Sequence, residues 1–359
     1  MKNLLFLLLI PLIIFRYFRS LPDYEIGQSI RITSVVFSDP VTYSGSINSK
    51  GSQGLKLAGL RVYLPLFPEI NYGDEVVIEG IVGDKKLERP RLIEIKKSVG
   101  YGAKYRNKII SFYQKVLPQP MSGLTAGITL GSKGSLTSEF WDRVRTTGVA
   151  HVVVASGTNV TFVVSFLMGT LTVFFPRRKA IAFVILGIIL YLFISGLEAP
   201  LIRAAIMSVL VFAAQETGRL VSGWRVLLIT AGVMLAFKPD WLVDLGFILS
   251  FVSTASLLLF EKRIRDKLFF VPGFFKEGLS TSLAAQIGVT PILFVTFGQF
   301  NIWSPVINAL VLWTVPFIMI FGALGGIVGL IVPFFGKLIL WLSYPFLWWF
   351  STMVGLFNL

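Results

Sequence analysis

The sequence of 359 residues has no cysteine, one histidine and few charged side chains. The lack of cysteine excludes disulfides, thiolate metal sites and cysteine nucleophiles, and it leaves the redox compartment undetermined. The single histidine, His151, excludes a metal centre built from several histidines. Charged residues make up 14% of the chain and hydrophobic residues 54%, whereas soluble domains carry about 25% charge. This composition predicts a polytopic membrane protein.

Most of the charge that is present is positive. The chain contains 33 Lys and Arg against 19 Asp and Glu, a formal net charge of +14. Such an excess favours contact with an anionic lipid surface or with a polyanionic substrate. Composition alone does not separate these two partners.

The N-terminus carries a short apolar run over residues 4–15, with Lys2 before it and Arg16 and Arg19 after it. A run of about 12–16 residues is short for a membrane span, which needs about 20. No small-residue cleavage site follows the run. We therefore expect an uncleaved membrane anchor over residues 1–19 rather than a signal peptide.

Residues 20–100 have a different character. Apolar and polar residues alternate over 28–37, 55–64 and 75–82, with turn-forming clusters between these runs, such as Asn-Tyr-Gly-Asp at 71–74. Alternation over short runs broken by Gly, Asn, Asp and Pro is typical of a small antiparallel β-barrel or sandwich. We expect a closed or nearly closed barrel of five strands.

Basic residues recur along this domain and are interleaved with tyrosines, a combination that single-strand-binding surfaces use. The candidates for contact with nucleic acid are Arg31, Lys56, Arg61, Tyr63, Lys85, Lys86, Arg89 and Arg91. The alternative interpretation is an ordinary solvated surface beside a membrane, because the excess of basic over acidic residues in this part is modest.

Three short helices should connect this domain to the membrane. Residues 101–117 place apolar side chains on one face and basic ones elsewhere, which predicts an amphipathic helix in the interface plane. Residues 118–131 and 136–148 predict two more short helices. We assign 101–148 to interfacial amphipathic helices and 149–359 to the transmembrane domain.

Beyond residue 148 the chain is nearly all apolar. The candidate spans are 149–175, 180–196, 200–215, 224–237, 241–260, 279–297, 303–331 and 338–357. The basic loops 176–179 and 261–267 should both be cytoplasmic, and the four spans between them, an even number, satisfy both assignments. The expected fold is a polytopic α-helical membrane protein with an N-terminal extracytoplasmic small β-barrel domain.

Polar residues at membrane depth are the candidates for a translocation path. The span that begins near 151 opens with histidine and then Ser-Gly-Thr-Asn at 156–159, which predicts an unwound turn facing protein or water. An ionisable group inside a span is a functional candidate because its burial is costly. The channel-lining candidates are His151, Ser156, Gly157, Asn159, Glu198, Arg203, Asp244, Gln286 and Asn308.

Each of these residues also has a purely structural interpretation. His151 could be an interfacial residue bonded to a backbone carbonyl, and Glu198 and Arg203 could pair to lock two helices. The residues alone leave both interpretations open. The sequence has no Ser-His-Asp order, no metal-ligand cluster and no phosphate-binding glycine loop, so we expect neither an enzyme nor a bound cofactor.

Several stretches resemble, in family order, the ComEC family, the inner-membrane channel proteins of bacterial natural transformation. They are 127–131 with the short helices after it, 148–157 (GVAHVVVASG), 200–207 (PLIRAAIM), 244–251 (DLGFILSF) and the set Gln286, Thr290-Pro291, Phe297-Gly298 and Asn308. Residues 72–80 (YGDEVVIEG) resemble the family's extracytoplasmic OB-fold-like domain. The resemblance covers roughly residues 120–320.

The resemblance implies a channel that passes one DNA strand into the cytoplasm, with single-stranded DNA, membrane lipids and other DNA-uptake proteins as partners. The family usually carries a second histidine where this chain has Asn159, so no proton relay is expected there. Many members end in a metallo-β-lactamase-like domain, whose His-x-His-x-Asp motif does not occur in this sequence. If such a nuclease is used, we expect it on a separate chain.

Two other functions stay open at the level of sequence. One is a transporter or exporter of a small or lipid-like solute, with broken helices around a midplane site. The other is a membrane scaffold that transports nothing. Salt-dependent binding of single-stranded DNA by the domain at 20–100 would favour the channel, and a bound lipid or metabolite would favour the transporter.

Overall fold

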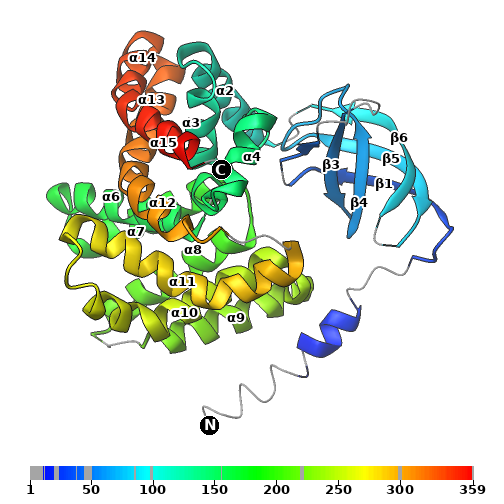
Figure 1. Ribbon diagram of the computed structural model, residues 1–359. Helices are drawn as coiled ribbons and strands as arrows, with labels where there is room; N and C mark the ends of the chain where they lie inside the picture. Colours follow the sequence, from blue (N-terminus) through cyan, green and yellow to red (C-terminus); the bar gives the residue numbers. More distant parts are fainter. Residues whose placement is uncertain are drawn as a thin grey trace.

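The computed structural model describes residues 11, 13–19, 24–37, 39–43, 51–84, 86–97, 100–154, 156–218, 222–297 and 301–357. A sheet domain and a helical domain lie side by side (Figure 1). Residues 13–19 form a short helix before the first strand. Most of the apolar run that predicts an N-terminal anchor lies outside the described residues.

The sheet domain has six described strands in two antiparallel sheets of three. The strands are β1 (Ser29–Val35), β2 (Val41–Tyr43), β3 (Ser52–Leu57), β4 (Leu60–Pro65), β5 (Glu75–Val82) and β6 (Leu87–Lys96). The sheet orders are β1-β5-β6 and β2-β3-β4, and a parallel bridge between Arg61 and Lys86 lies between β4 and β6. Alternate residues point inward, so that Val62, Val76 and Ile78 share one apolar core.

The run at 55–64 is part of a hairpin rather than one strand, so the domain has six described strands where five were expected. Ala58 and Gly59 both take positive φ, 47° and 84°. A two-residue hairpin loop of type I′ requires positive φ at both positions. Lys56 consequently faces Arg61 across the hairpin. Sequence reasoning missed the turn because Ala-Gly lacks the Asn or Asp that usually marks it.

The helical domain follows directly. Its helices are α2 (Tyr101–Val116), α3 (Met121–Leu130), α4 (Ser138–Thr146), α5 (Ala150–Val153), α6 (Gly157–Phe174), α7 (Arg177–Ser195), α8 (Ala199–Glu216), α9 (Gly223–Phe237), α10 (Leu245–Lys267), α11 (Gly273–Phe297), α12 (Ser304–Val311), α13 (Val315–Ile331), α14 (Pro333–Leu342) and α15 (Tyr344–Leu356), with 3-10 turns η1 (Pro239–Val243) and η2 (Leu312–Thr314).

Six stretches in the described chain are long and apolar enough to cross a membrane. Five of them are α6, α7, α8, α10 and most of α11, and the sixth runs unbroken from α12 through η2 and α13. Helices α14 and α15 form a seventh candidate, bent by 45°. Helix α9 is apolar but has 15 residues. The chain is therefore a multi-pass membrane protein with an N-terminal sheet domain.

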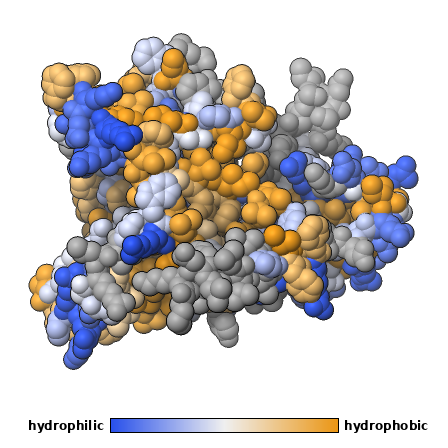
Figure 2. Space-filling view, turned by 90° about the horizontal axis from the view of Figure 1, so that it is seen from below, coloured by the Kyte–Doolittle hydropathy of each residue, from blue (hydrophilic) through white to orange (hydrophobic). Residues whose placement is uncertain are grey.

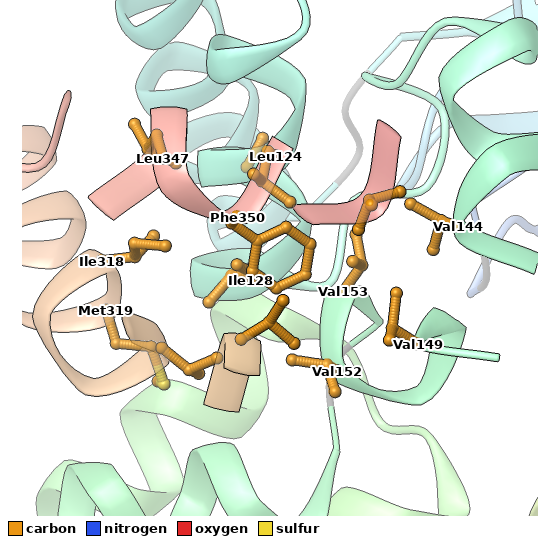
Figure 3. Close-up of a cluster of buried hydrophobic side chains, with 14 of the residues drawn as sticks. Leu124, Ile128, Val144, Val149, Val152, Val153, Ile318, Met319, Leu347 and Phe350 are labelled. Carbon is orange, nitrogen blue, oxygen red and sulfur yellow. The ribbon is translucent and has the colours of Figure 1, made fainter. Parts of the chain in front are cut away.

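The largest core joins the short helices to the end of the chain. Leu124 and Ile128 of α3 meet Phe350 of α15 and Ile318 of α13 in one buried cluster (Figure 3). Helix α2 packs against the same cluster, and its buried Tyr113 hydroxyl donates to the Gly322 carbonyl of α13 at 2.8 Å. Burial raises the pKa of this tyrosine.

The outer surface of the long helices is apolar, as a lipid-facing surface must be. Phe183, Leu186, Leu190 and Phe193 of α7 are all exposed. Figure 2 shows hydrophobic side chains across the middle of one face, with hydrophilic side chains at one edge and over the sheet domain at the other.

Several expected span boundaries differ from the structure. The predicted span at 149–175 is divided into α5 and α6, with Val154 and Ser156 between them in non-helical conformation. Residues 157–159, expected in the break, instead form the first turn of α6. The basic segments expected as loops at 176–179 and 261–267 are mostly helical, because they form the first turn of α7 and the last turns of α10.

Candidate functional site

The start of α6 lies against the charged residue of α8. A Cβ added to Gly157 would lie 2.5 Å from Arg203 Nη2 and 3.4 Å from Ala204 Cβ. Arg203 Nη1 donates to the Ser250 carbonyl of α10 at 2.9 Å. Three long helices therefore meet where the glycine lets the guanidinium lie under the first turn of α6.

Arg203 has no carboxylate partner in the described part of the chain. Glu198, which could have paired with it, instead lies with Oε1 3.3 Å from Lys133 Nζ, in the loop after α3. Arg203 Nε is buried and makes no hydrogen bond to any described residue. A half-buried cation in a span that is held by one carbonyl keeps capacity to attract an anion.

Asn159 connects the same turn to α3. Its Nδ2 donates to the Ile128 carbonyl at 2.8 Å, and its Oδ1 accepts from Ser156 Oγ at 3.1 Å. The side chain is 1% exposed, and the Tyr191 hydroxyl of α7 faces it. The amide holds the broken helix against its neighbours, which is how freed polar groups are satisfied at membrane depth.

His151 lies on α5 at the start of a separate chain of polar contacts. Its Nδ1 donates to the Gly148 carbonyl at 3.2 Å, and Ser304 Oγ of α12 donates to the same carbonyl at 3.3 Å. Asn308 Nδ2 then donates to Ser282 Oγ of α11 at 2.8 Å. Gly148 has a φ of +77°, and a Cβ there would lie 2.6 Å from Ser304 Oγ.

The remaining predicted residues of the spans lie on two further helices. Asp244 caps α10, because its Oδ1 accepts from Phe247 N at 3.1 Å. Gln286 is half-buried on α11 and makes no hydrogen bond within the described ranges. The structure thus brings Ser156, Gly157 and Asn159 together with Arg203, and it gives His151 and Asn308 a contact chain of their own.

One residue that sequence reasoning did not select joins the two domains. Arg106 of α2 is 1% exposed, and its Nη2 lies 2.7 Å from Asp39 Oδ2 of the sheet domain. Its Nη1 donates to the carbonyls of Ile194 and Ser195 at the end of α7, at 3.2 and 2.9 Å. The guanidinium carbon lies 4.5 Å from the centre of the Tyr72 ring.

Tyr72 and Asp39 extend this junction toward α8. Burial raises the pKa of the Tyr72 hydroxyl, the positive Arg106 lowers it in part, and the carboxylates of Asp39 and Glu198 raise it further. Asp39 Oδ2 also accepts from the Lys133 backbone N at 3.0 Å. The junction therefore links the sheet domain, α2, the loop after α3 and the ends of α7 and α8.

Four of the nucleic-acid candidates lie close together on the sheet domain. Lys56 of β3 is opposite Arg61 of β4, and both are exposed. Tyr63, 42% exposed, is two residues farther along the same face of β4, and Lys86 bridges to Arg61. We call these four residues the basic strip. It faces the helical domain, because Lys56 Nζ lies 3.6 Å from Asp244 Oδ2 at the start of α10.

The other candidates lie on the second sheet or next to it. Arg31 and Arg91 are both register partners of Glu79 on β5. Arg31 Nη1 is 3.7 Å from Glu79 Oε1, so one of the two positive charges in this row is offset. Arg89 is exposed, with a φ of +48° at a β-bulge. Lys85 lies outside the described residues.

An exposed groove between the end of β4 and β6 was also missed by sequence reasoning. Phe67 and Ile93, 82% and 48% exposed, line it together with Pro68, Pro90 and Arg91, and its volume is about 760 Å³. An exposed ring beside a basic side chain can stack on a nucleobase. The only sequence signal was Phe67 between Pro65 and Pro68, which does not by itself indicate exposure.

The chain resembles known proteins over most of its length. The family described as "Competence protein" matches residues 128–359. "ComE operon protein 3" of Bacillus subtilis (strain 168) is 31% identical over 262 residues, which cover 70% of this chain and 31% of that protein. "Uncharacterized protein YcaI" of Escherichia coli (strain K12) is 24% identical over 224 residues, 59% of this chain and 30% of that protein. No solved structure matches.

The chain thus spans about a third of the length of the curated relatives that it matches. The family match begins in α3 and includes every channel-lining candidate. It confirms the ComEC-family resemblance drawn from the motifs. Because the match covers well over half of the sequence, the chain belongs to the competence protein family.

Proposed function

We propose that this chain forms the path by which one strand of DNA crosses the cytoplasmic membrane during natural transformation. The observation that carries the proposal is the position of the basic strip, whose Lys56 lies 3.6 Å from Asp244 at an end of the helical domain. Membership of the competence family supports the same role. A strand collected by the strip would therefore lie beside the start of α10.

The basic strip has the chemistry that collects a single strand. Lys56, Arg61 and Lys86 supply charges for phosphates, and Tyr63 supplies a ring for stacking, which is tolerant of sequence. Contacts of this kind release counterions, so binding weakens as salt rises. Phe67, just after β4, and Arg91 of β6 offer a further ring and charge of the same kind.

The helical domain offers a sparsely charged route. Ser156, Gly157, Asn159 and Arg203 meet where α5 and α6 are separated. Non-helical backbone at membrane depth is tolerated where it faces protein or a wet cavity. Few cations along the route suit passage, because strong binding at many sites would hold a polyanion in place.

The distribution of charge supports an external sheet domain. The sheet domain contacts the end of α7 through Arg106 and the start of α10 through Asp244. The basic residues of α7 and α10 lie at the opposite ends of these helices. Because clusters of Lys and Arg stay in the cytoplasm, the sheet domain lies on the outer side in this proposal.

A solute transporter is the second candidate. Arg203, with a buried Nε that no described residue satisfies, lies beside a helix break. Broken helices with polar ends form midplane sites for small anions in several transporter folds. This candidate predicts that a small anion, rather than DNA, depends on Arg203.

Uptake of donor DNA tests the proposal directly. Donor DNA labelled on one strand is given to a strain whose transformation depends on this chain, with and without its gene. Without the chain, we expect DNA to remain bound at the cell surface while the nuclease-protected label falls to background. Unchanged protected label with the chain absent would contradict the proposal, and a defect limited to a small anion would favour the transporter.

A further inference from the structure

The two domains are attached by ionic contacts of very different burial. The contact between Arg106 and Asp39 is buried on both sides, with side chains 2% and 9% exposed. The contact between Lys56 and Asp244 is open to water, with side chains 65% and 33% exposed, and its atoms are 3.6 Å apart. An exposed ion pair is weak and screened by salt, whereas a buried one is not easily broken.

Asp244 uses its two oxygens for different purposes. Oδ1 accepts from Phe247 N at 3.1 Å and caps α10, while Oδ2 faces Lys56. The cap requires an acceptor but no charge, since Asn and Ser cap helices as well as Asp does. The negative charge of Asp244 is therefore not needed for the start of α10.

Asp244 is also the residue of the helical domain that forms an ion pair with the basic strip, through Lys56. Lys86 Nζ is 3.3 Å from Glu88 Oε1 of β6, and Arg61 has no ion pair among the described residues. Within the basic strip, the described cross-domain ion pair is that of Lys56 with Asp244. A lysine ammonium is a compact point charge without a planar fork of donors. It can therefore contact either a carboxylate oxygen or a phosphate oxygen.

We propose that the Asp244 carboxylate holds the position on Lys56 that a phosphate of the incoming DNA strand takes. Asp244 is then a built-in competitor of the strand. This inference rests on the proposed function and adds to it a step in which the strand displaces Asp244 from Lys56. Arg106 and Asp39 keep the domains attached while the exposed contact opens.

The exchange couples strand binding to the start of α10. Whatever weakens the contact between Lys56 and Asp244 must strengthen binding of the strand, and the strand must weaken that contact by the same factor. Ser250, whose carbonyl accepts from Arg203, lies on the first turns of the same helix. Release of Asp244 thus acts on the helix that also positions the cation of the route.

Binding of single-stranded DNA by the full chain in lipid nanodiscs measures the competition. A fluorescent oligothymidine reports binding by anisotropy at fixed salt. We expect Asp244→Asn to tighten the Kd about twofold to fivefold, the range that the energy of an exposed ion pair allows. Asp244→Ser, which also preserves the cap, should give the same result.

Two controls separate competition from general repulsion. In a Lys56→Met background, Asp244→Asn should leave the Kd unchanged, because the competitor has lost its target. Glu75→Gln removes an exposed carboxylate of similar geometry, 3.5 Å from Lys96 with side chains 28% and 63% exposed, but away from the basic strip. It should also leave the Kd unchanged. The melting temperature of each variant verifies that the fold is intact.

The outcomes distinguish this inference from the proposed function. If the unaltered chain shows no salt-dependent binding, the proposed function fails and the inference with it. If the chain binds but neither Asp244 variant tightens binding, only the inference fails. Equal tightening with and without Lys56 would mean that Asp244 merely repels DNA, and this too would overturn the inference.

Discussion

At the scale of single residues, Gly157 is the position where one added side chain has the clearest effect. A Cβ there meets Arg203 Nη2 at 2.5 Å, the end of a side chain that can shift. We expect Gly157→Ala to be tolerated. Gly157→Leu should push Arg203 off the Ser250 carbonyl, cost about 1–3 kcal/mol through overpacking, and reduce DNA uptake to background with the protein still inserted.

The matched control is Gly169→Leu in the same helix, where nothing lies within 4 Å of an added Cβ. It should leave uptake and membrane level unchanged. His151→Gln should be milder than Gly157→Leu, since its ring is exposed and donates only to the Gly148 carbonyl. Normal uptake in Gly157→Leu cells, or a larger defect from His151→Gln, would show that this view of the turn is wrong.

The buried junction should be the most sensitive of the ion pairs that the described residues form. Asp39→Asn leaves Arg106 charged, buried and without its carboxylate, and losing one partner of a buried pair costs about 3–5 kcal/mol. We expect a lower melting temperature and faster proteolysis between the domains. Glu216→Gln, which removes the partner of the exposed Arg178, should cost less than about 1 kcal/mol. Equal effects of the two changes would refute the proposed importance of the junction.

Sequence reasoning found polar residues at this scale but not their partners. Asp39 and Arg106 are 67 positions apart, and no local pattern connects them. A signal for Arg106 did exist, because it lies three and seven residues before Ile109 and Tyr113, on the buried stripe of α2. Because α2 carries several other basic residues, Arg106 did not stand out among them. The pairing of Glu198 with Lys133 likewise depends on tertiary structure alone.

At the scale of elements, the hairpin of α13 and α14 depends on glycine. A Cβ at Gly336 would lie 2.2 Å from Gly329 Cα, a backbone atom that cannot move aside. We expect Gly336→Ala to cost about 1–3 kcal/mol or more by overpacking and to lower the level of folded protein in membranes. Gly355→Ala in α15, with open space around it, should be neutral or slightly stabilising. Fluorescence-detected gel filtration compares them, and similar profiles would count against this packing.

Helices and strands were predictable to different degrees. Long apolar runs identify the spans, because the bilayer sets their length. The break between α5 and α6 was expected from Ser-Gly-Thr-Asn, but it lies earlier, since Gly157 can begin a helix after the cap position Ser156. The Ala58–Gly59 turn was not predicted because it lacks the usual Asn or Asp. The strand β6 was not predicted because its residues do not alternate strictly between apolar and polar.

At the scale of the whole molecule, the order of the helices and their charges can be combined into one topology. The basic residues of α7 lie at its start and those of α10 at its end. Between these two points the chain runs through four helices, α7, α8, α9 and α10. Both ends lie on one side only if α9 crosses as well. Its 15 residues extend about 22 Å at 1.5 Å per residue, short of a core of about 30 Å, and η1 follows it at once.

Single-cysteine labelling decides this topology, and the chain has no cysteine of its own. Lys86→Cys on the sheet domain should react with a membrane-impermeant maleimide in cells whose outer barrier is opened. Arg178→Cys and Lys262→Cys, both exposed at basic helix ends, should react only after the cytoplasmic membrane is permeabilised. Labelling of Lys262→Cys but not Arg178→Cys from outside would mean that α9 does not cross. Protection of Lys86→Cys would place the sheet domain inside and remove the collecting role of the basic strip.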